Sequence, residues 1–220
     1  MSGTPPAVTL YLVRHGAVDG VDGWCVGQSD VALAVDGRTA VERLAAEWTA
    51  PRPPRIVASD LARARDSAEA LARAWHGDGI HVATDPRLRE MHFGAWDGRA
   101  WDEIARDDPH ALAEWMSCWQ EARSPGGEGF GDVIARAGAW LADAVRDARA
   151  DGISSLTAVA HAGSIRALLV HALGLPRAVV FRLRVDHARV SALRVTGDVT
   201  RDACEAAELL VLNADRASDG

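Results

Sequence analysis

The sequence predicts an α/β fold of three layers, with helices on both faces of a mostly parallel, doubly wound sheet. Short apolar runs alternate along the chain with longer segments whose apolar residues recur at helical spacing, which is the pattern of βαβ units. The runs at 8–13 and 156–160 are apolar on both faces, as strands buried in a parallel sheet are. Two late runs, at 190–195 and 209–212, lie close enough in the chain to pair as an antiparallel edge.

The first half of the chain alternates strand and helix. After the first strand, a loop rich in Gly and Asp occupies 18–33, and a helix is expected over 36–48, before a proline cluster. A second strand is expected at 55–58, with Ser59 and Asp60 as the cap of the helix that follows it. The buried stripe of that helix is expected to consist of Leu61, Ala64, Ala68, Leu71 and Trp75.

The second half continues the alternation and adds a helical insertion. A third strand is expected at 81–84, and an ordered loop with two glycines follows it. Residues 98–128 form a tryptophan-rich helical segment that we expect to cover the edge of the sheet. A long amphipathic helix is expected at 130–150, and a mobile tail from about residue 214.

Composition bounds the class of protein. The chain has 220 residues, a net charge of -7 and no lysine, so it lacks the basic field that a general nucleic-acid binder needs. No apolar run is long enough to cross a membrane, and no signal peptide is seen before the first strand. The three cysteines stand far apart, which indicates neither a disulfide framework nor a zinc cluster. Without a repeat or a linker, we expect one cytoplasmic domain over 1–220.

Two buried strands end in a histidine followed closely by a glycine. Arg14 and His15 follow the first strand, and His161 follows the strand at 156–160. Because parallel strands bring their carboxyl ends to one edge of a sheet, we expect both imidazoles at the same place. Arg63 stands in the first turn of a helix, where a cation opposes the helix dipole unless an anion compensates it. The insertion at 98–128 would lie over this site.

Two arginines and two histidines in one pocket favour an oxyanion ligand, most naturally a phosphoryl group. Neighbouring arginine charge disfavours imidazolium, so His15 can stay neutral, attack phosphorus and form a phosphohistidine. Arg14, Arg63 and His161 would stabilise the equatorial oxygens of the transferring group. Cationic side chains then do this work, so neither a metal nor a cofactor is expected.

A leaving alkoxide needs a proton, and Glu90, in the loop after the third strand, is the candidate donor. The alternative interpretation is a surface acid that neutralises Arg87 and Arg89. For His161 alone, the alternative is a satisfied histidine of the core. His92 is left open. Four further histidines are assigned to structural or exposed positions: His76, His110, His171 and His187.

Four motifs in order resemble those of the histidine phosphatase superfamily, the phosphoglycerate-mutase-like group. They are LVRHG at 12–16, ASDLARA at 58–64, LRE at 88–90 with FGAWDG at 93–98, and VAHAGSIR at 159–166. The resemblance covers about residues 9–173. It implies that His15 is the phosphorylated nucleophile, that Arg14, Arg63 and His161 form the phosphate pocket, and that Glu90 is the proton donor.

Within the superfamily, the chain is most similar to α-ribazole phosphatase-like proteins, through the segments 23–33 and 125–128. This resemblance implies Gln28 and Ala162 as further substrate-binding residues and α-ribazole 5′-phosphate as the substrate. The chain departs from the pattern after the first histidine, where apolar residues stand at places that are polar in many members. The departures are Ala17, Val18 and Val21, with Gly129 in place of a common serine.

Three functions are weighed. The first is a metal-independent phosphomonoesterase that acts on a small phosphorylated metabolite through a phosphohistidine. The second is phosphoglycerate mutase-type phosphoryl transfer, which needs a more basic lid than the Arg99, Arg106 and Arg123 of the insertion provide. The third is a non-catalytic phosphate-binding or scaffold relative. Neither nucleic acid nor a membrane is expected as a partner, and a homodimer is compatible with the sequence.

Overall fold

A computed structural model of the chain describes residues 5–78 and 81–217, which form a six-stranded sheet in the order β3-β2-β4-β1-β5-β6. Strands β3, β2, β4 and β1 run parallel, β5 pairs antiparallel with β1, and β6 pairs antiparallel with β5. The strands are β1 (Val8–Arg14), β2 (Arg55–Ala58), β3 (Ala83–Thr84), β4 (Ser155–Ala160), β5 (Val190–Val195) and β6 (Ala207–Ala214). The mostly parallel sheet is confirmed, and the antiparallel strand β5 lies one position inside the edge.

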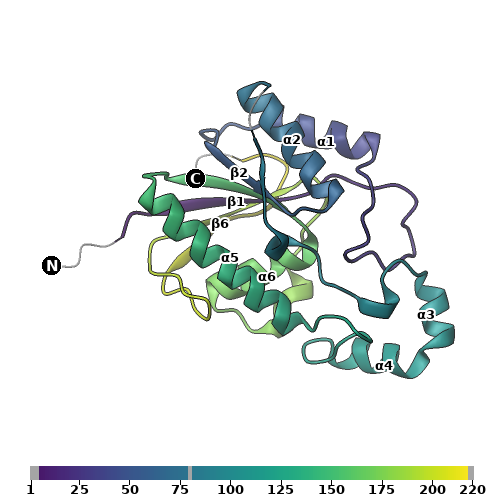
Figure 1. Cartoon of the computed structure of the whole chain (residues 1–220). Coiled ribbons are helices and arrows are strands. Elements are labelled where there is room, and N and C mark those ends of the chain that lie inside the picture. The colour runs from purple at the N-terminus through teal and green to yellow at the C-terminus, as the bar shows by residue number, and fades with distance from the viewer. Residues whose placement is uncertain (1–4, 79–80, 218–220) are drawn as a thin grey trace.

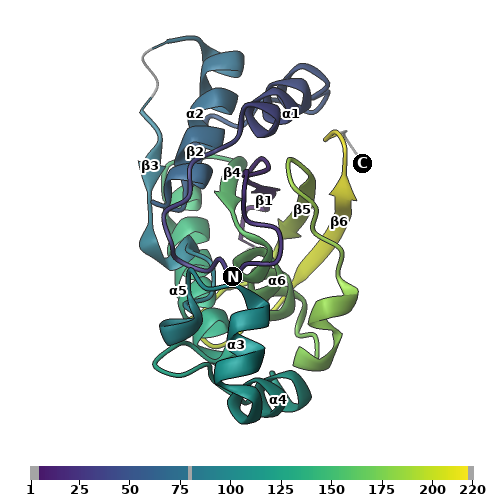
Figure 2. The same ribbon diagram turned by 90° about the vertical axis from the view of Figure 1, so that its right-hand side faces the viewer.

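Helices cover both faces of the sheet, and a further pair lies outside these layers. Helices α1 and α2 pack on one face, and α5 and α6 pack on the other (Figure 1). The outer pair, α3 and α4, stands beyond the end of the sheet (Figures 1 and 2). The helices are α1 (Val35–Ala46), α2 (Ala62–His76), α3 (Trp101–Asp107), α4 (Pro109–Cys118), α5 (Phe130–Ala150) and α6 (Ala162–Leu173), with the 3-10 turns η1 (Pro86–Leu88), η2 (Gly94–Trp96) and η3 (Arg177–Arg182).

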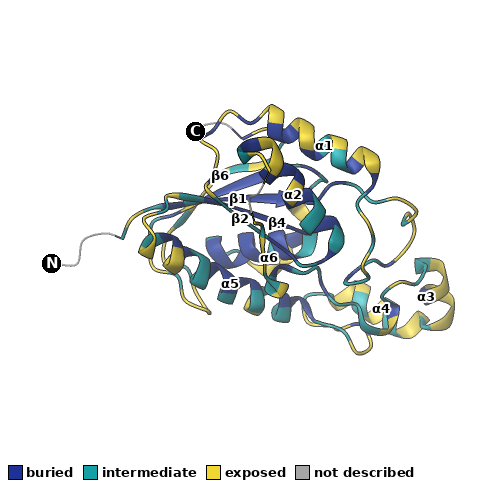
Figure 3. Cartoon of the chain, turned by 45° about the horizontal axis from the view of Figure 1, so that its top comes forward, coloured by how far each residue is buried: buried dark blue, intermediate teal, exposed yellow. Residues whose placement is uncertain are grey.

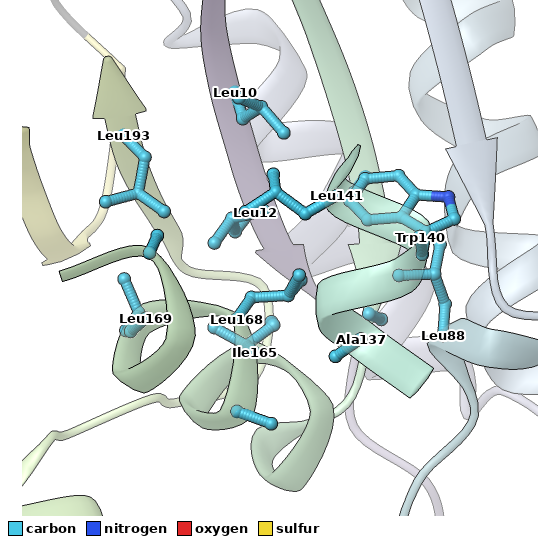
Figure 4. Packing of buried hydrophobic residues seen from close by; sticks show 14 of the residues in the cluster. Leu10, Leu12, Leu88, Ala137, Trp140, Leu141, Ile165, Leu168, Leu169 and Leu193 are labelled. Atoms are coloured by element: carbon cyan, nitrogen blue, oxygen red, sulfur yellow. The ribbon is translucent and has the colours of Figure 1, made fainter. Parts of the chain in front are cut away.

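The core consists of two apolar layers separated by the sheet. Alternate residues of β1 enter different layers: Leu10 and Leu12 pack toward α5 and α6, whereas Tyr11 and Val13 pack toward α1 and α2. Figure 4 shows the first of these layers around Leu10 and Leu12. Each fully buried leucine contributes about 1.5–3 kcal/mol to the free energy of unfolding relative to an exposed one. The central strands are therefore a rigid support for the residues that follow them.

Burial falls off toward the insertion. The central strands are buried, while α3 and α4 carry wide exposed surfaces (Figure 3). Within α3, Ile104 is buried, and α4 has no fully buried residue. The helical insertion expected at 98–128 is thus present as two short helices that rest on loops rather than on the sheet. No helix in 5–78 or 81–217 is long and apolar enough to span a bilayer.

The pairing of β1 with β4 sets the position of the site. In this parallel register Arg14 lies opposite Ala160, so the next residues, His15 and His161, leave the sheet side by side. The backbone N–H of His15 donates to the carbonyl of Ala160 over 3.0 Å, which extends the ladder past the end of the strand. Two residues 146 positions apart in the numbering therefore meet because their strands are neighbours.

Two details differ from the sequence expectation. Ser59 and Asp60 do not cap α2; the N–H of Ala62 donates instead to the carboxylate of Asp30 over 2.7 Å. Asp60 is used elsewhere, in a bidentate pair with Arg89. The distant Asp30 can cap the helix because the loop after β1 folds back over its first turn.

The end of the described chain contacts the fold. The carbonyl of Ala217 accepts hydrogen bonds from the backbone N–H groups of Thr49 and Ala50 and from the hydroxyl of Thr49. Ala217 itself is buried. The segment expected to be a mobile tail from residue 214 is therefore held against the loop after α1 at this point; residues 218–220 lie outside the described residues.

Candidate active site

His15 is the buried centre of the site. It is 4% exposed, and its Nδ1 lies 2.7 Å from the carbonyl oxygen of Gly16. Since a carbonyl can only accept, Nδ1 carries the proton and Nε2 carries the free lone pair. Burial, and then the nearby charge of Arg63, holds the pKa of His15 well below its usual value. The ring is therefore neutral at physiological pH, with a nucleophilic nitrogen that is not blocked by a proton.

His161 faces His15 across the end of the sheet. The two ring centroids are 4.9 Å apart, and His161 is completely buried at the N-cap of α6. Burial, followed by the proximity of His15, lowers the pKa of His161. Neither ring nitrogen has a hydrogen-bond partner among the described residues. Buried polar atoms are normally paired, so this ring is prepared for a group that the protein itself does not supply.

Two arginines complete the pocket. Arg63 is 2% exposed and donates to the carbonyls of Ser29 and Gly27 over 2.8 and 2.6 Å, which fastens the loop after β1 to α2. Arg14 donates from Nη1 to the carbonyl of Val185 over 2.8 Å. Its Nε is buried and has no partner among the described residues. The buried, unpaired nitrogen atoms of Arg14 and His161 are suited to bind one anion between them.

Glu90 contacts the first turn of α6. Its Oε2 accepts from the N–H of Gly163 over 3.0 Å, and its Oε1 accepts from the N–H of Met91 over 2.8 Å. The alternative of a surface acid does not fit, because the arginines beside it pair elsewhere. Arg87 binds Asp85 and Asp143, and Arg89 binds Asp60.

Gly163 is required for the approach of this carboxyl group. A Cβ added at residue 163 would lie 2.0 Å from Oε1 of Glu90. Only a residue without a side chain lets the acid reach the first turn of α6. The glycine after His161 therefore sets the position of Glu90.

A chamber of about 500 Å³ opens beside these residues. Its charged wall is formed by Arg14, Glu90 and Arg166, with Ala162 and Gly163 beside them, and aromatic rings form much of the rest. Because Arg14 and Glu90 belong both to this lining and to the site around His15, the chamber adjoins that site and offers room for the rest of a substrate.

The geometry agrees with the comparisons with known proteins. The model of the histidine phosphatase superfamily (branch 1) matches residues 10–202. This chain belongs to the histidine phosphatase superfamily. It is 30% identical over 209 residues to the adenosylcobalamin/alpha-ribazole phosphatase of Salmonella typhimurium, which covers 93% of this chain and 96% of that protein.

The relatives of this histidine phosphatase include further phosphatases as well as proteins named as probable phosphoglycerate mutases, such as one from Enterobacter sp. that is 29% identical over 84% of this chain and 83% of that protein. The glucosyl-3-phosphoglycerate phosphatase of Mycobacterium tuberculosis is 36% identical over 175 residues, 76% of each chain. The crystal structure of the alpha-ribazole phosphatase from Shigella flexneri has a TM-score of 0.81 at 26% identity, covering 97% of this chain and 100% of that one. The fold class expected from the sequence is therefore confirmed.

The structure places His187, expected at a structural or exposed position, beside His15. Its ring centroid lies 5.1 Å from that of His15, in the loop before β5. Burial, and then the charge of Arg14, lowers the pKa of His187 to about 4. The signal that could have revealed it is the direction of β5. An antiparallel strand presents its first residues at the edge where the parallel strands end.

Arg136 is a second residue that the sequence reasoning missed. It lies on α5 and donates to the carbonyls of Arg87, Arg89 and Glu90 over 2.7–2.9 Å. Its Nε also binds Glu128 over 2.8 Å. The guanidinium therefore holds the loop that carries the candidate acid of this histidine phosphatase.

The two further substrate-binding candidates differ in their placement. Ala162 lines the chamber at the start of α6. The side chain of Gln28 donates to the carbonyl of Glu90 over 3.0 Å and accepts from Arg89 over 3.3 Å. Gln28 thus joins the loop after β1 to the Glu90 loop. His92, left open above, accepts at Nδ1 from the N–H of Gly94 over 3.3 Å.

Proposed function

We propose that this phosphatase hydrolyses phosphomonoesters through a phosphohistidine at His15. One observation carries the proposal: unpaired, buried groups of Arg14 and His161 surround a neutral imidazole whose Nε2 is free. Such a cup is suited to one tetrahedral anion with its phosphorus close to that nitrogen. A non-catalytic phosphate binder would have no need for a nucleophile with a fixed tautomer.

In the first half-reaction, the lone pair on Nε2 of His15 attacks phosphorus, and the bond from phosphorus to the alcohol oxygen breaks. Glu90, in its acid form, gives its proton to that leaving oxygen. The ring gains positive charge as the N–P bond forms, and the carbonyl of Gly16 accepts from Nδ1–H and stabilises this charge. Arg14, Arg63 and His161 stabilise the equatorial oxygens.

In the second half-reaction, water takes the place of the alcohol. The Glu90 carboxylate removes a proton from the water, the water oxygen attacks phosphorus, and the N–P bond breaks. The products are inorganic phosphate, the neutral ring of His15 and the acid form of Glu90. Protein cations carry the charge stabilisation, so we propose that no metal ion takes part.

We propose α-ribazole 5′-phosphate as the substrate. The support is the similarity to an adenosylcobalamin/alpha-ribazole phosphatase over most of both chains. A relative named glucosyl-3-phosphoglycerate phosphatase makes that sugar phosphate the first competitor. We also propose a cytoplasmic enzyme that forms a homodimer, which cell fractionation and sedimentation of the purified protein test.

Mutase-type transfer is less well supported, because the cations of the insertion are already paired. Arg99 binds Asp107 over 2.6 Å, and Arg106 also contacts this carboxylate. Arg123 pairs with Asp132. None of these three arginines lines the chamber, so they offer no second anion site there.

The test is hydrolysis of a panel that contains α-ribazole 5′-phosphate, glucosyl-3-phosphoglycerate, 3-phosphoglycerate and 4-nitrophenyl phosphate, with and without EDTA. We expect phosphate release that EDTA does not change and that His15→Ala abolishes. His92→Ala is the matched control, since His92 is a loop histidine outside the chamber lining. Equal rates for wild type and His15→Ala would overturn the proposal.

A further inference from the structure

The chamber beside the phosphate pocket is walled by aromatic rings. Four of the chain's eight tryptophans and all three of its phenylalanines line it. These rings come from segments far apart in the sequence: the loop after β1, both helices of the insertion, the start of α5 and the turn η3. Phe130 belongs to the apolar layer on α5 and α6, and Phe93, Trp115 and Trp119 pack against that layer. These rings therefore extend the core to the wall of a cavity that is open to a ligand.

The rings support one another in two groups. In the first, Trp101 and Trp115 stack with centroids 6.2 Å apart, and Phe93 meets both edge-on. In the second, Trp119 meets Phe181 edge-on at 4.5 Å. Because each ring of these two groups contacts another ring, these parts of the walls are preorganised and lose little side-chain entropy when a ligand binds.

Two of the aromatic rings in these walls are exposed to water. Trp24 is 46% exposed and Phe181 is 59% exposed, although both line the chamber. Apolar rings left in water cost free energy, and an apolar ligand that covers them would remove this cost.

Few charged groups face this cavity. Those of its lining are Arg14, Glu90 and Arg166, and the first two belong to the phosphate pocket. Arg166 donates from Nε to the carbonyl of Leu183 and lies 5.7 Å from the centroid of Phe181. A second acidic group on the substrate would therefore have only Arg166 to pair with in this lining. A nucleobase with several hydrogen-bonding groups would leave most of those groups unpaired.

We propose that this chamber selects phosphomonoesters whose alcohol portion carries a planar aromatic ring with few hydrogen-bonding groups. The phosphoryl group sits among Arg14, Arg63 and the two histidines, and the ring lies between the two aromatic groups. The proposal rests on the phosphatase function proposed above and adds the recognition of the leaving alcohol. Trp24 and Phe181, at the exposed rim, are the specificity-determining residues.

The first test compares esters of primary alcohols with similar leaving-group pKa values. These are 3-phenylpropyl, 3-cyclohexylpropyl and n-propyl phosphate, with AMP and 3-phosphoglycerate as polar comparisons. We expect kcat/KM for the phenyl ester to exceed that for the propyl ester by about 10-fold or more and that for the cyclohexyl ester by about threefold, as ring stacking adds to apolar burial. Equal values for the phenyl and cyclohexyl esters, or a preference for AMP or 3-phosphoglycerate, would overturn the proposal.

The second test uses rim variants, which remove exposed rings without opening the core. Trp24→Ala and Phe181→Ala should each lower kcat/KM for the phenyl ester about 10-fold and leave that for the propyl ester within about twofold. Met116→Ala is the matched control, because Met116 lies on α4, is 66% exposed and does not line the chamber. An equal loss on both esters would show a structural role and contradict the proposal. A change in oligomeric state with unchanged ester preference would instead assign the rings to a protein interface.

Failure of the specificity proposal is distinguishable from failure of the phosphatase function. If no ester is hydrolysed and no phosphate is trapped on His15, the proposed function fails. Affinities of the His15→Ala protein for the phenyl and propyl esters, measured by titration calorimetry, then test the chamber alone. Tighter binding of the phenyl ester, lost in Trp24→Ala, supports the chamber proposal, and equal affinities overturn it.

Discussion

The substitution Gly163→Ala tests whether Glu90 acts from the position that the structure gives it. The added methyl group would lie 2.0 Å from Oε1 of Glu90, which no real contact allows. The obstructing atom is the far end of a flexible side chain, so the carboxyl group turns away at little cost to the fold. It then loses the 3.0 Å hydrogen bond from the N–H of residue 163 and the position from which we propose that it protonates the leaving oxygen.

Gly163→Ala should change kcat/KM strongly and the free energy of unfolding only slightly. A positioned general acid contributes roughly 10²–10⁴-fold, so kcat/KM for an alkyl phosphate should fall by about 10²-fold or more. Alanine in place of glycine near the start of α6 adds up to about 1 kcal/mol of helix propensity. The lost hydrogen bond to Glu90 costs about 1 kcal/mol, so the free energy of unfolding should change by less than about 1 kcal/mol. Loss of activity in a protein of nearly unchanged stability is therefore the expected result.

The assay is the leaving-group dependence of hydrolysis in wild type, Gly163→Ala, Glu90→Gln and the double variant. Gly163→Ala should slow n-propyl phosphate strongly and 4-nitrophenyl phosphate by less than about threefold, since nitrophenolate needs little protonation. The double variant should be no slower than Glu90→Gln alone, because both changes remove the same acid. Losses that multiply, or an unchanged leaving-group dependence, would refute this position for the acid.

Two further predictions concern stability. Arg63→Lys should lower the free energy of urea unfolding by about 2–4 kcal/mol, because one ammonium cannot reach both the Gly27 and Ser29 carbonyls. Arg65→Lys, the control on the same helix, should change this free energy by less than about 0.5 kcal/mol. Equal effects of the two substitutions would contradict the anchoring role of Arg63. Burial lowers the pKa of His187 to about 4, so between pH 6.5 and pH 4 the unfolded chain binds a proton that the folded chain does not. His187 alone should lower the free energy of unfolding by up to about 3 kcal/mol as pH falls through this window and should have no effect above it, and His15 and His161, whose pKa values are also lowered by burial, should add to this fall. His187→Asn should make the free energy of unfolding depend less steeply on pH between pH 6.5 and pH 4. An unaltered dependence would show that burial does not lower the pKa of His187.

Much of the sheet could be predicted from sequence, because its central strands β1, β4 and β5 are short apolar runs that are buried along most of their length. The run at 190–195 coincides with β5, and β4 begins one residue before the expected run. The convergence of His15 and His161 follows from one fact, that β1 and β4 are parallel neighbours. An apolar run that ends in a histidine can be recognised locally in the sequence. The geometry of a parallel sheet then brings the two histidines to the same edge.

The parts that escaped prediction depend on contacts between distant segments. The cap of α2 comes from Asp30, in a loop whose path no local pattern specifies. His187 reaches the site because β5 runs antiparallel, and Arg136 reaches the Glu90 loop across the packing of α5. The aromatic chamber is assembled from several segments, so the tryptophans of the insertion could be recognised in the sequence, but their common cavity could not.

The most direct test of the central claim is rapid acid-free quenching during turnover, followed by mass spectrometry of the modified peptide. Our account predicts acid-labile phosphate on the ring of His15 in wild type, in larger amount in Glu90→Gln with a good leaving group, and none in His15→Ala. Phosphate on another residue, or rapid turnover by His15→Ala, would contradict it.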